Sequence, residues 1–179
     1  MDTEDGRAAV RIRPVRAGDE LELHRLLAAN REHLAATSPA RPDSYYTLGG
    51  QEAAVAGQVA AREAGTAASY VIALGERIVG RVSLSNIVRG AFQSADLGYW
   101  IDREHQGRGI VSNAVGLLVG VARDDLGLHR VAAGTLTDNV GSQRVLVRNG
   151  FEQYGLARRY LRIAGEWRDH ALFQRILDD

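Results

Sequence analysis

The feature that most constrains this sequence is a strand-like segment that leads through a glycine-containing turn into a long apolar helix. Residues 95–101 form a β-rich run, and residues 110–126 have the length and periodicity of a buried helix. The connection includes the sequence Gln-Gly-Arg-Gly at residues 106–109. Glycines at such a turn expose backbone N–H groups at the positive end of a helix dipole. The pattern predicts an α/β domain with a phosphate- or pyrophosphate-binding turn, and a tight, closely packed turn is the alternative.

The residue types that the chain lacks exclude several kinds of chemistry. All 22 basic residues are arginine, which excludes lysine Schiff bases and the catalytic lysines of phosphate loops and kinases. The chain has no cysteine, which excludes disulfides, thiolate zinc sites and acyl transfer through a protein thiol. The five histidines show no metal-ligand spacing and no clustering with carboxylates. We therefore expect no metal site.

Length and charge describe an ordinary globular chain. A chain of 179 residues suits one α/β domain and is too short for two well-buried ones. The 22 acidic residues balance the basic ones, so the net charge does not favour a nucleic-acid or membrane surface. The longest apolar run, residues 114–122, is too short to span a membrane. We expect one cytoplasmic domain over residues 1–179, with residues 1–8 flexible.

The remaining elements follow from hydrophobic periodicity and turn residues. Strands are predicted at residues 10–14, 69–74, 78–87, 95–101, 131–136, 151–163 and 167–176. Helices are predicted from the Asp19 cap to residue 34, over residues 51–64 and 110–126, and from an Asp138 or Asn139 cap to residue 148. Residues 35–49 are predicted to be a long loop that contacts a ligand or serves only as a connector. This order indicates a mixed sheet wrapped by helices.

Five short motifs follow one another along almost the whole chain. They are Asn30-Arg31-Glu32-His33-Leu34, Leu97-Gly98-Tyr99-Trp100-Ile101 leading into His105-Gln106-Gly107-Arg108-Gly109-Ile110, Asn139-x-x-Ser142, Arg148-Asn149-Gly150-Phe151, and Gly165-x-Trp167-x-Asp169-His170. Their order and spacing resemble the GNAT superfamily of N-acetyltransferases, and within it the Rim-type ribosomal-protein N-terminal serine/alanine acetyltransferases. The resemblance implies the GNAT fold, an α/β (α+β) domain with a mixed, mostly antiparallel sheet of about six to seven strands and about four flanking helices.

The resemblance also implies acetyl-CoA as co-substrate. Gln106 and Gly109 match the family's pyrophosphate-binding turn, whereas Val111 departs from the small residue at its last position. In relatives the pantetheine arm pairs with the end of the preceding strand, and the positions of Asn139 and Ser142 face the arm and its sulfur. The implied cofactor-binding residues are Trp100, Ile101, Gln106, Gly107, Arg108, Gly109, Ile110, Val111, Ser112, Asn139 and Ser142.

Ser142 and Asp96 are the catalytic residues that the resemblance implies. Ser142 matches the donor to the departing thiolate, and Asp96 matches an acidic position that draws the amine proton through water. Deprotonating an α-amine at pH 7 costs only about 1 to 1.4 kcal/mol, whereas a lysine side chain costs roughly 4.6 kcal/mol, so a weak base suffices for an α-amine. A first-turn helix serine and a solvated strand aspartate are the structural alternatives for these two residues.

On the acceptor side, the predicted contacts are Arg31, His33, Tyr45 and Tyr46. The paired tyrosines could form the wall of a peptide or drug-sized site, or simply pack the loop. The leading hypothesis is direct acetyl transfer to a primary amine in a ternary complex, most simply the N-terminus of a protein or peptide. A small amine such as an antibiotic is the first alternative acceptor, and a non-catalytic CoA-binding module is the second alternative function. The sequence leaves open whether the protein forms a homodimer.

Overall fold

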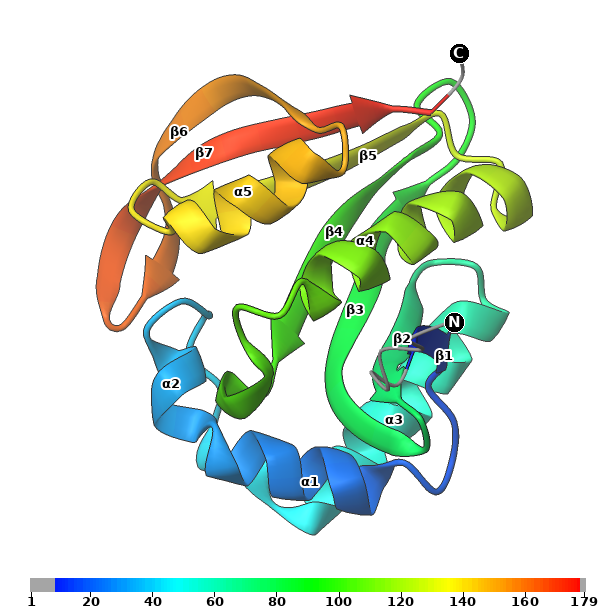
Figure 1. Ribbon diagram of the computed structural model, residues 1–179, viewed down its shortest axis with the longest axis vertical. Helices are drawn as coiled ribbons and strands as arrows, with labels where there is room; N and C mark the ends of the chain where they lie inside the picture. The colour runs from blue at the N-terminus through cyan, green and yellow to red at the C-terminus, as the bar shows by residue number, and fades with distance from the viewer. Residues whose placement is uncertain (1–8, 178–179) are drawn as a thin grey trace, which may run out of the picture.

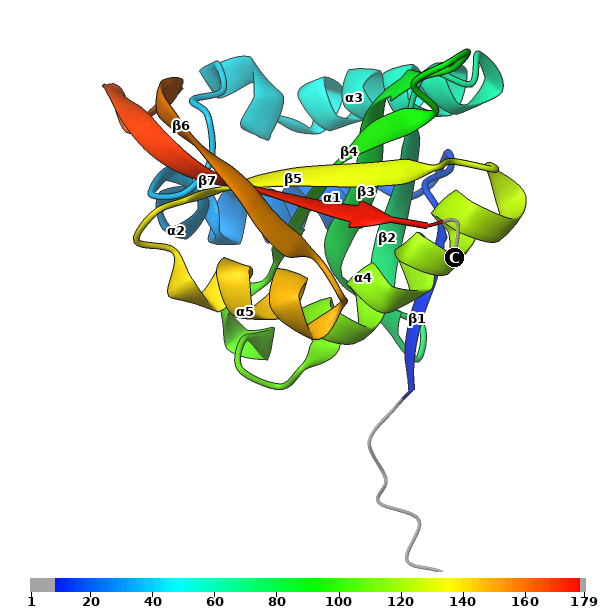
Figure 2. The same cartoon turned by 90° about the horizontal axis from the view of Figure 1, so that it is seen from above.

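The computed structural model describes residues 9–177, in which one seven-stranded sheet has helices on both faces (Figure 1). Residues 1–8, expected to be flexible, lie outside the described residues. The strands are β1 Val10–Pro14, β2 Ala68–Leu74, β3 Arg77–Val88, β4 Ser94–Ile101, β5 Arg130–Leu136, β6 Glu152–Ile163 and β7 Glu166–Ile176. The α-helices are α1 Glu20–Ala29, α2 Arg31–Ala35, α3 Leu48–Glu63, α4 Ile110–Gly120 and α5 Val140–Arg148. The expected mixed α/β fold is confirmed. Figure 2 shows α3 on one side of the sheet and α4 and α5 on the other.

The strands lie in the order β1-β2-β3-β4-β5-β7-β6, and every neighbouring pair is antiparallel except β4 with β5. These two central strands pair only where Ser94–Asp96 lies beside Arg130–Ala132. Beyond that short ladder they diverge, as Figure 1 shows. Each strand keeps its other neighbour, so the divergence leaves one free backbone edge on β4 and one on β5.

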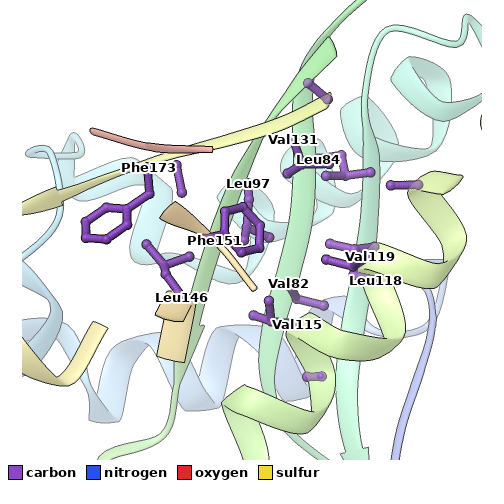
Figure 3. Close-up of a cluster of buried hydrophobic side chains, with 14 of the residues drawn as sticks. Val82, Leu84, Leu97, Val115, Leu118, Val119, Val131, Leu146, Phe151 and Phe173 are labelled. Carbon is purple, nitrogen blue, oxygen red and sulfur yellow. The ribbon is translucent and has the colours of Figure 1, made fainter. Parts of the chain in front are cut away.

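The main core lies between the sheet and the helices α4 and α5 (Figure 3). Val115 and Leu118 of α4 pack on Val82 and Leu84 of β3. Leu146 anchors α5 near Phe151, which directly precedes β6, and Phe173 of β7. Leu118 and Leu146 are fully buried, which is worth about 1.5 to 3 kcal/mol for each side chain. This packing fixes the N-terminal ends of α4 and α5 beside the divergence of β4 and β5.

The predicted loop over residues 35–49 is shorter than expected. It contains a 3-10 turn at Asp43–Tyr46, and α3 begins at Leu48, where Thr47 caps it by accepting the N–H of Gly50 at 3.1 Å. The two glycines at residues 49 and 50 favour a loop in the sequence, but both lie inside α3. Residue 50 must be glycine because a Cβ there would lie 1.9 Å from the Ser44 carbonyl oxygen. Close backbone approach, and not flexibility, explains this glycine.

Two further boundaries differ from the predicted ones. The first helix breaks at Asn30 into α1 and α2, and the predicted helix 110–126 ends in a π-helical turn at Val121–Asp125. Asp19 is the N-cap residue of α1 as predicted, but its side chain makes no capping hydrogen bond. Its carboxylate instead accepts hydrogen bonds from both terminal nitrogens of Arg13, at 2.8 and 2.7 Å, and from the backbone N–H of Arg16, at 3.0 Å. Burial disfavours the Asp19 carboxylate, but these hydrogen bonds outweigh it and lower its pKa.

Candidate active site

A cleft opens where β4 and β5 diverge, and we call it the main cleft. Its walls are residues 97–101 of β4, residues 133–136 of β5, the turn before α4, and the first residues of α5. Its volume is about 690 Å³, within the range of small-molecule sites. The free edges of the two strands therefore face a space into which an extended ligand can insert as an added strand.

The glycine turn forms an anion site at one end of the main cleft. Gly107 and Gly109 have φ values of +72° and +74°, which other residues rarely adopt, and Gly109 caps α4. The first hydrogen bond into the helix runs from the Asn113 N–H to the Gly109 carbonyl. Within the described part of the chain, the N–H groups of residues 107–112 have no acceptor. Free donors at the positive end of a helix dipole favour a phosphate.

The charge of the main cleft agrees with this assignment. Arg108, Arg144 and Arg148 line it, and no carboxylate is among its lining residues in the part of the chain that is described. The whole chain is neutral, so this is a local positive region that the net charge conceals. The main cleft thus suits a ligand that carries several phosphates.

A buried polar network positions the glycine turn. The Asp102 carboxylate accepts the Asn30 amide at 3.0 Å and lies 3.0 Å from Nδ1 of His105, while the Asn30 side-chain oxygen accepts the Arg103 N–H at 2.9 Å. Burial disfavours the charged Asp102, but the hydrogen bonds from Asn30 and His105 outweigh it and lower its pKa. The helix break at Asn30 therefore fastens α1 and α2 to the turn that precedes α4.

The centre of the main cleft holds a serine and tyrosine pair. The hydroxyl groups of Ser142 and Tyr99 lie 2.7 Å apart, and Asn139 caps α5 by accepting the Ser142 N–H at 3.1 Å. Burial raises the pKa of Tyr99 to about 12, against the smaller lowering effect of the Ser142 hydrogen bond. Tyr99 therefore stays protonated at neutral pH. The sequence analysis did not name Tyr99 as a site residue. A buried tyrosine usually needs a hydrogen-bond partner for its hydroxyl, which is the signal that could have identified it.

All the predicted cofactor-binding residues line the main cleft. The structure also places the predicted acceptor residue His33 and the predicted base Asp96. His33 lines the main cleft instead of the acceptor side, and its Nε2 lies 2.7 Å from the Gln106 amide. Asp96 is exposed on β4 and accepts the Asn86 amide at 2.9 Å. It is not among the residues that line the main cleft.

A second pocket, the side pocket, adjoins the main cleft. Its volume is about 400 Å³, and it shares Gly98, Tyr99 and Trp100 with the main cleft. The predicted acceptor residues Arg31, Tyr45 and Tyr46 line it. Two lining residues, Arg41 and Arg81, were missed because they come from the loop and from β3, which only the folded chain brings together.

The aromatic wall of the side pocket is held in place from both sides. Tyr45 and Tyr46 meet edge to face with ring centres 5.5 Å apart, and the Arg31 guanidinium lies 4.4 Å from the Tyr46 ring centre. The side chain of Gln51, fully buried in α3, donates to the Tyr45 carbonyl at 2.6 Å. The loop is therefore a positioned wall of the side pocket.

The described residues hold no group of three or more His, Cys, Asp or Glu side chains that could bind a metal. No helix in the same part of the chain is long and apolar enough to cross a membrane.

Comparison with known proteins agrees with this geometry. Residues 9–152 match the family model described as acetyltransferase (GNAT) domain. The chain is 39% identical over 161 residues to the probable N-acetyltransferase YjcK of Bacillus subtilis, covering 89% of each protein. It superposes with a TM-score of 0.91 on ribosomal-protein-S5-alanine acetyltransferase from Vibrio fischeri, with 32% identity over 95% of this chain and 94% of that one. It also superposes on RimJ of Mycobacterium smegmatis, whose structure was solved in complex with CoA-disulfide, with a TM-score of 0.90. That pair is 30% identical, and the match covers 93% of this chain and 81% of RimJ. The chain belongs to the GNAT acetyltransferase family and is an N-acetyltransferase that uses acetyl-CoA.

Proposed function

We propose that this protein acetylates the α-amino group of a protein or peptide N-terminus by direct attack on acetyl-CoA in a ternary complex. The observation that carries the proposal is the shared wall of Gly98, Tyr99 and Trp100 between the main cleft and the side pocket. A thioester in the main cleft and an amine in the side pocket would meet at this wall. The Vibrio fischeri relative is named for acetylating alanine of a ribosomal protein, which supports a protein N-terminus as the acceptor class.

In this proposal the glycine turn binds the pyrophosphate of acetyl-CoA. The free N–H groups of residues 107–112 donate to it, and the arginines of the main cleft offset the remaining phosphate charge. The pantetheine arm lies along the free edge of β4, near Trp100 and Ile101. This arrangement directs the sulfur toward Ser142 at the start of α5.

Ser142 assists departure of the thiolate as a hydrogen-bond donor. Tyr99, with a pKa of about 12, is a weaker acid than a thiol near 8.5, so full proton transfer from Tyr99 to the thiolate is unfavourable. The Tyr99 hydroxyl lies 2.7 Å from Ser142 Oγ and 3.3 Å from the Ser142 carbonyl oxygen. In the proposed mechanism Tyr99 is the donor of this pair, which leaves the serine hydrogen free to point at the sulfur. The proton that the attacking amine loses can finally neutralise the thiolate, so the net reaction needs no strong acid.

The base requirement favours an α-amine over a lysine side chain. The α-amine costs about 3 kcal/mol less to deprotonate at neutral pH. Asp96 is exposed and outside the main cleft, so it would accept the amine proton only through water. That arrangement is adequate for an amine whose pKa is already near 7.7 to 8.0.

Release of free CoA thiol, followed with a panel of amines, tests the proposal. We expect turnover with short peptides that have a free N-terminus and none with the same peptides after N-terminal blocking. Turnover confined to small amines such as aminoglycosides would replace the peptide by a small-amine acceptor. CoA binding without turnover on any amine would indicate a binding module and contradict the proposal.

A further inference from the structure

We propose that the side pocket selects N-termini that are followed by acidic residues, and that Arg41 and Arg81 recognise the carboxylate. This inference rests on the proposed function, because it assumes that the amine to be acetylated occupies the side pocket. It adds a substrate preference and two specificity-determining residues to that function.

The charge of the side pocket is the first observation. Arg31, Arg41 and Arg81 line it, and within residues 9–177 no carboxylate does so. Arg31 forms an ion pair with Asp43 of the 3-10 turn, which satisfies much of its charge. Within the same residues, no carboxylate lies within ion-pair distance of Arg41 or Arg81. Among the described residues, the side pocket therefore presents two guanidinium groups without a counter-ion.

These two arginines come from different elements that line the side pocket. Arg81 lies on β3 directly opposite Trp100 of β4, so it belongs to the floor of the side pocket. Arg41 comes from the loop above that floor, where its guanidinium lies 5.2 Å from the Tyr45 ring centre. A bridge between Pro39 and Ile163 brings the β6–β7 hairpin against this loop. A peptide that enters with its amine at the shared wall would pass between the two cations.

Of the two arginines, Arg81 has the greater need of an anionic partner because it is half-buried. A partly desolvated guanidinium without an anionic partner is unfavourable, and a substrate carboxylate would supply that partner. A carboxylate on the same sheet face, Asp96, stands opposite Ser85 in the register and accepts a hydrogen bond from the Asn86 amide. The carboxylates of residues 9–177 thus leave the charge of Arg81 for a ligand.

Paired peptides test this preference. The peptides share an N-terminal alanine and differ only in having two aspartates or two asparagines at their second and third positions. We expect the wild-type kcat/KM to be about tenfold higher for the aspartate peptide, and this ratio to fall as salt screens the charges. Arg81→Gln and Arg41→Gln should each lower kcat/KM for the aspartate peptide about three- to tenfold and change it less than twofold for the asparagine peptide.

Arg77→Gln is the matched control, because Arg77 lies exposed on the same strand outside the side pocket, and it should leave the ratio unchanged. Thermal melts establish that each variant is folded. Equal rates on both peptides in wild type would overturn the acidic preference and leave the proposed function standing. A different outcome is that neither peptide is acetylated and that phosphoethanolamine is acetylated faster than ethanolamine. That result would indicate that the arginines bind the phosphate of a small amine substrate, and it would overturn both proposals.

Discussion

Gly109→Asp is expected to weaken acetyl-CoA binding at least tenfold in calorimetry. Gly109 caps α4 with a φ of +74°, at the centre of the free N–H groups that form the anion site. A carboxylate there would stand beside the phosphates and cancel the field of the helix N-terminus. A Cβ at this position meets no heavy atom within 4 Å, so the loss does not come from a clash within the protein, although the positive φ strains any side chain placed there.

Gly109→Asn separates charge from backbone strain. Asparagine has nearly the same shape as aspartate, and both tolerate positive φ better than other side chains. We expect the asparagine variant to bind acetyl-CoA more tightly than the aspartate variant, with the difference shrinking in high salt. Unchanged affinity in a folded Gly109→Asp protein would place the cofactor away from this turn.

Ser142→Ala is expected to lower kcat about 100-fold, while KM for acetyl-CoA changes little. The loss corresponds to one positioned donor to the thiolate, at the low end of the usual range because a thiolate leaves readily. The pyrophosphate turn is untouched, so binding of the cofactor should persist. Ser142→Cys keeps a weak donor and should retain more activity than the alanine variant.

Tyr99→Phe completes this experiment because Tyr99 acts only through Ser142 in the account given above. It should lower kcat less than Ser142→Ala does, and the double variant should be no slower than Ser142→Ala alone. Multiplicative losses would show that Tyr99 contacts the reacting atoms independently. A wild-type rate in Ser142→Ala would remove the serine from the mechanism. Thermal melts should accompany both variants, since Ser142 lies in the first turn of α5.

The parts of the site that depend on local sequence could be predicted from it. Gly107 and Gly109 adopt positive φ next to a helix start, and Asn139 caps α5, as their neighbours in the sequence indicate. Local patterns also gave all seven strands, because alternation and turn residues set them. Turn chemistry and periodicity therefore accounted for the frame of the main cleft.

The contacts that join distant segments could not be predicted in the same way. Tyr99 and Ser142 are 43 residues apart, and their contact depends on how far β4 and β5 diverge. His33 was expected on the acceptor side, but the Asn30 network turns α2 toward Gln106, 73 residues away. The composition of the side pocket follows from the loop, β3 and the last hairpin meeting in space. No periodicity in the sequence encodes these distances.

Mass-spectrometric mapping of one acetylated peptide distinguishes an α-amine acceptor from a lysine acceptor. The peptide has a free N-terminus and an internal lysine, and it is incubated with the protein and acetyl-CoA under initial-rate conditions. We expect acetyl on the α-amine first, because the lysine costs about 3 kcal/mol more to deprotonate and, within residues 9–177, no carboxylate lines the main cleft. Acetyl appearing first on the lysine side chain would contradict this expectation.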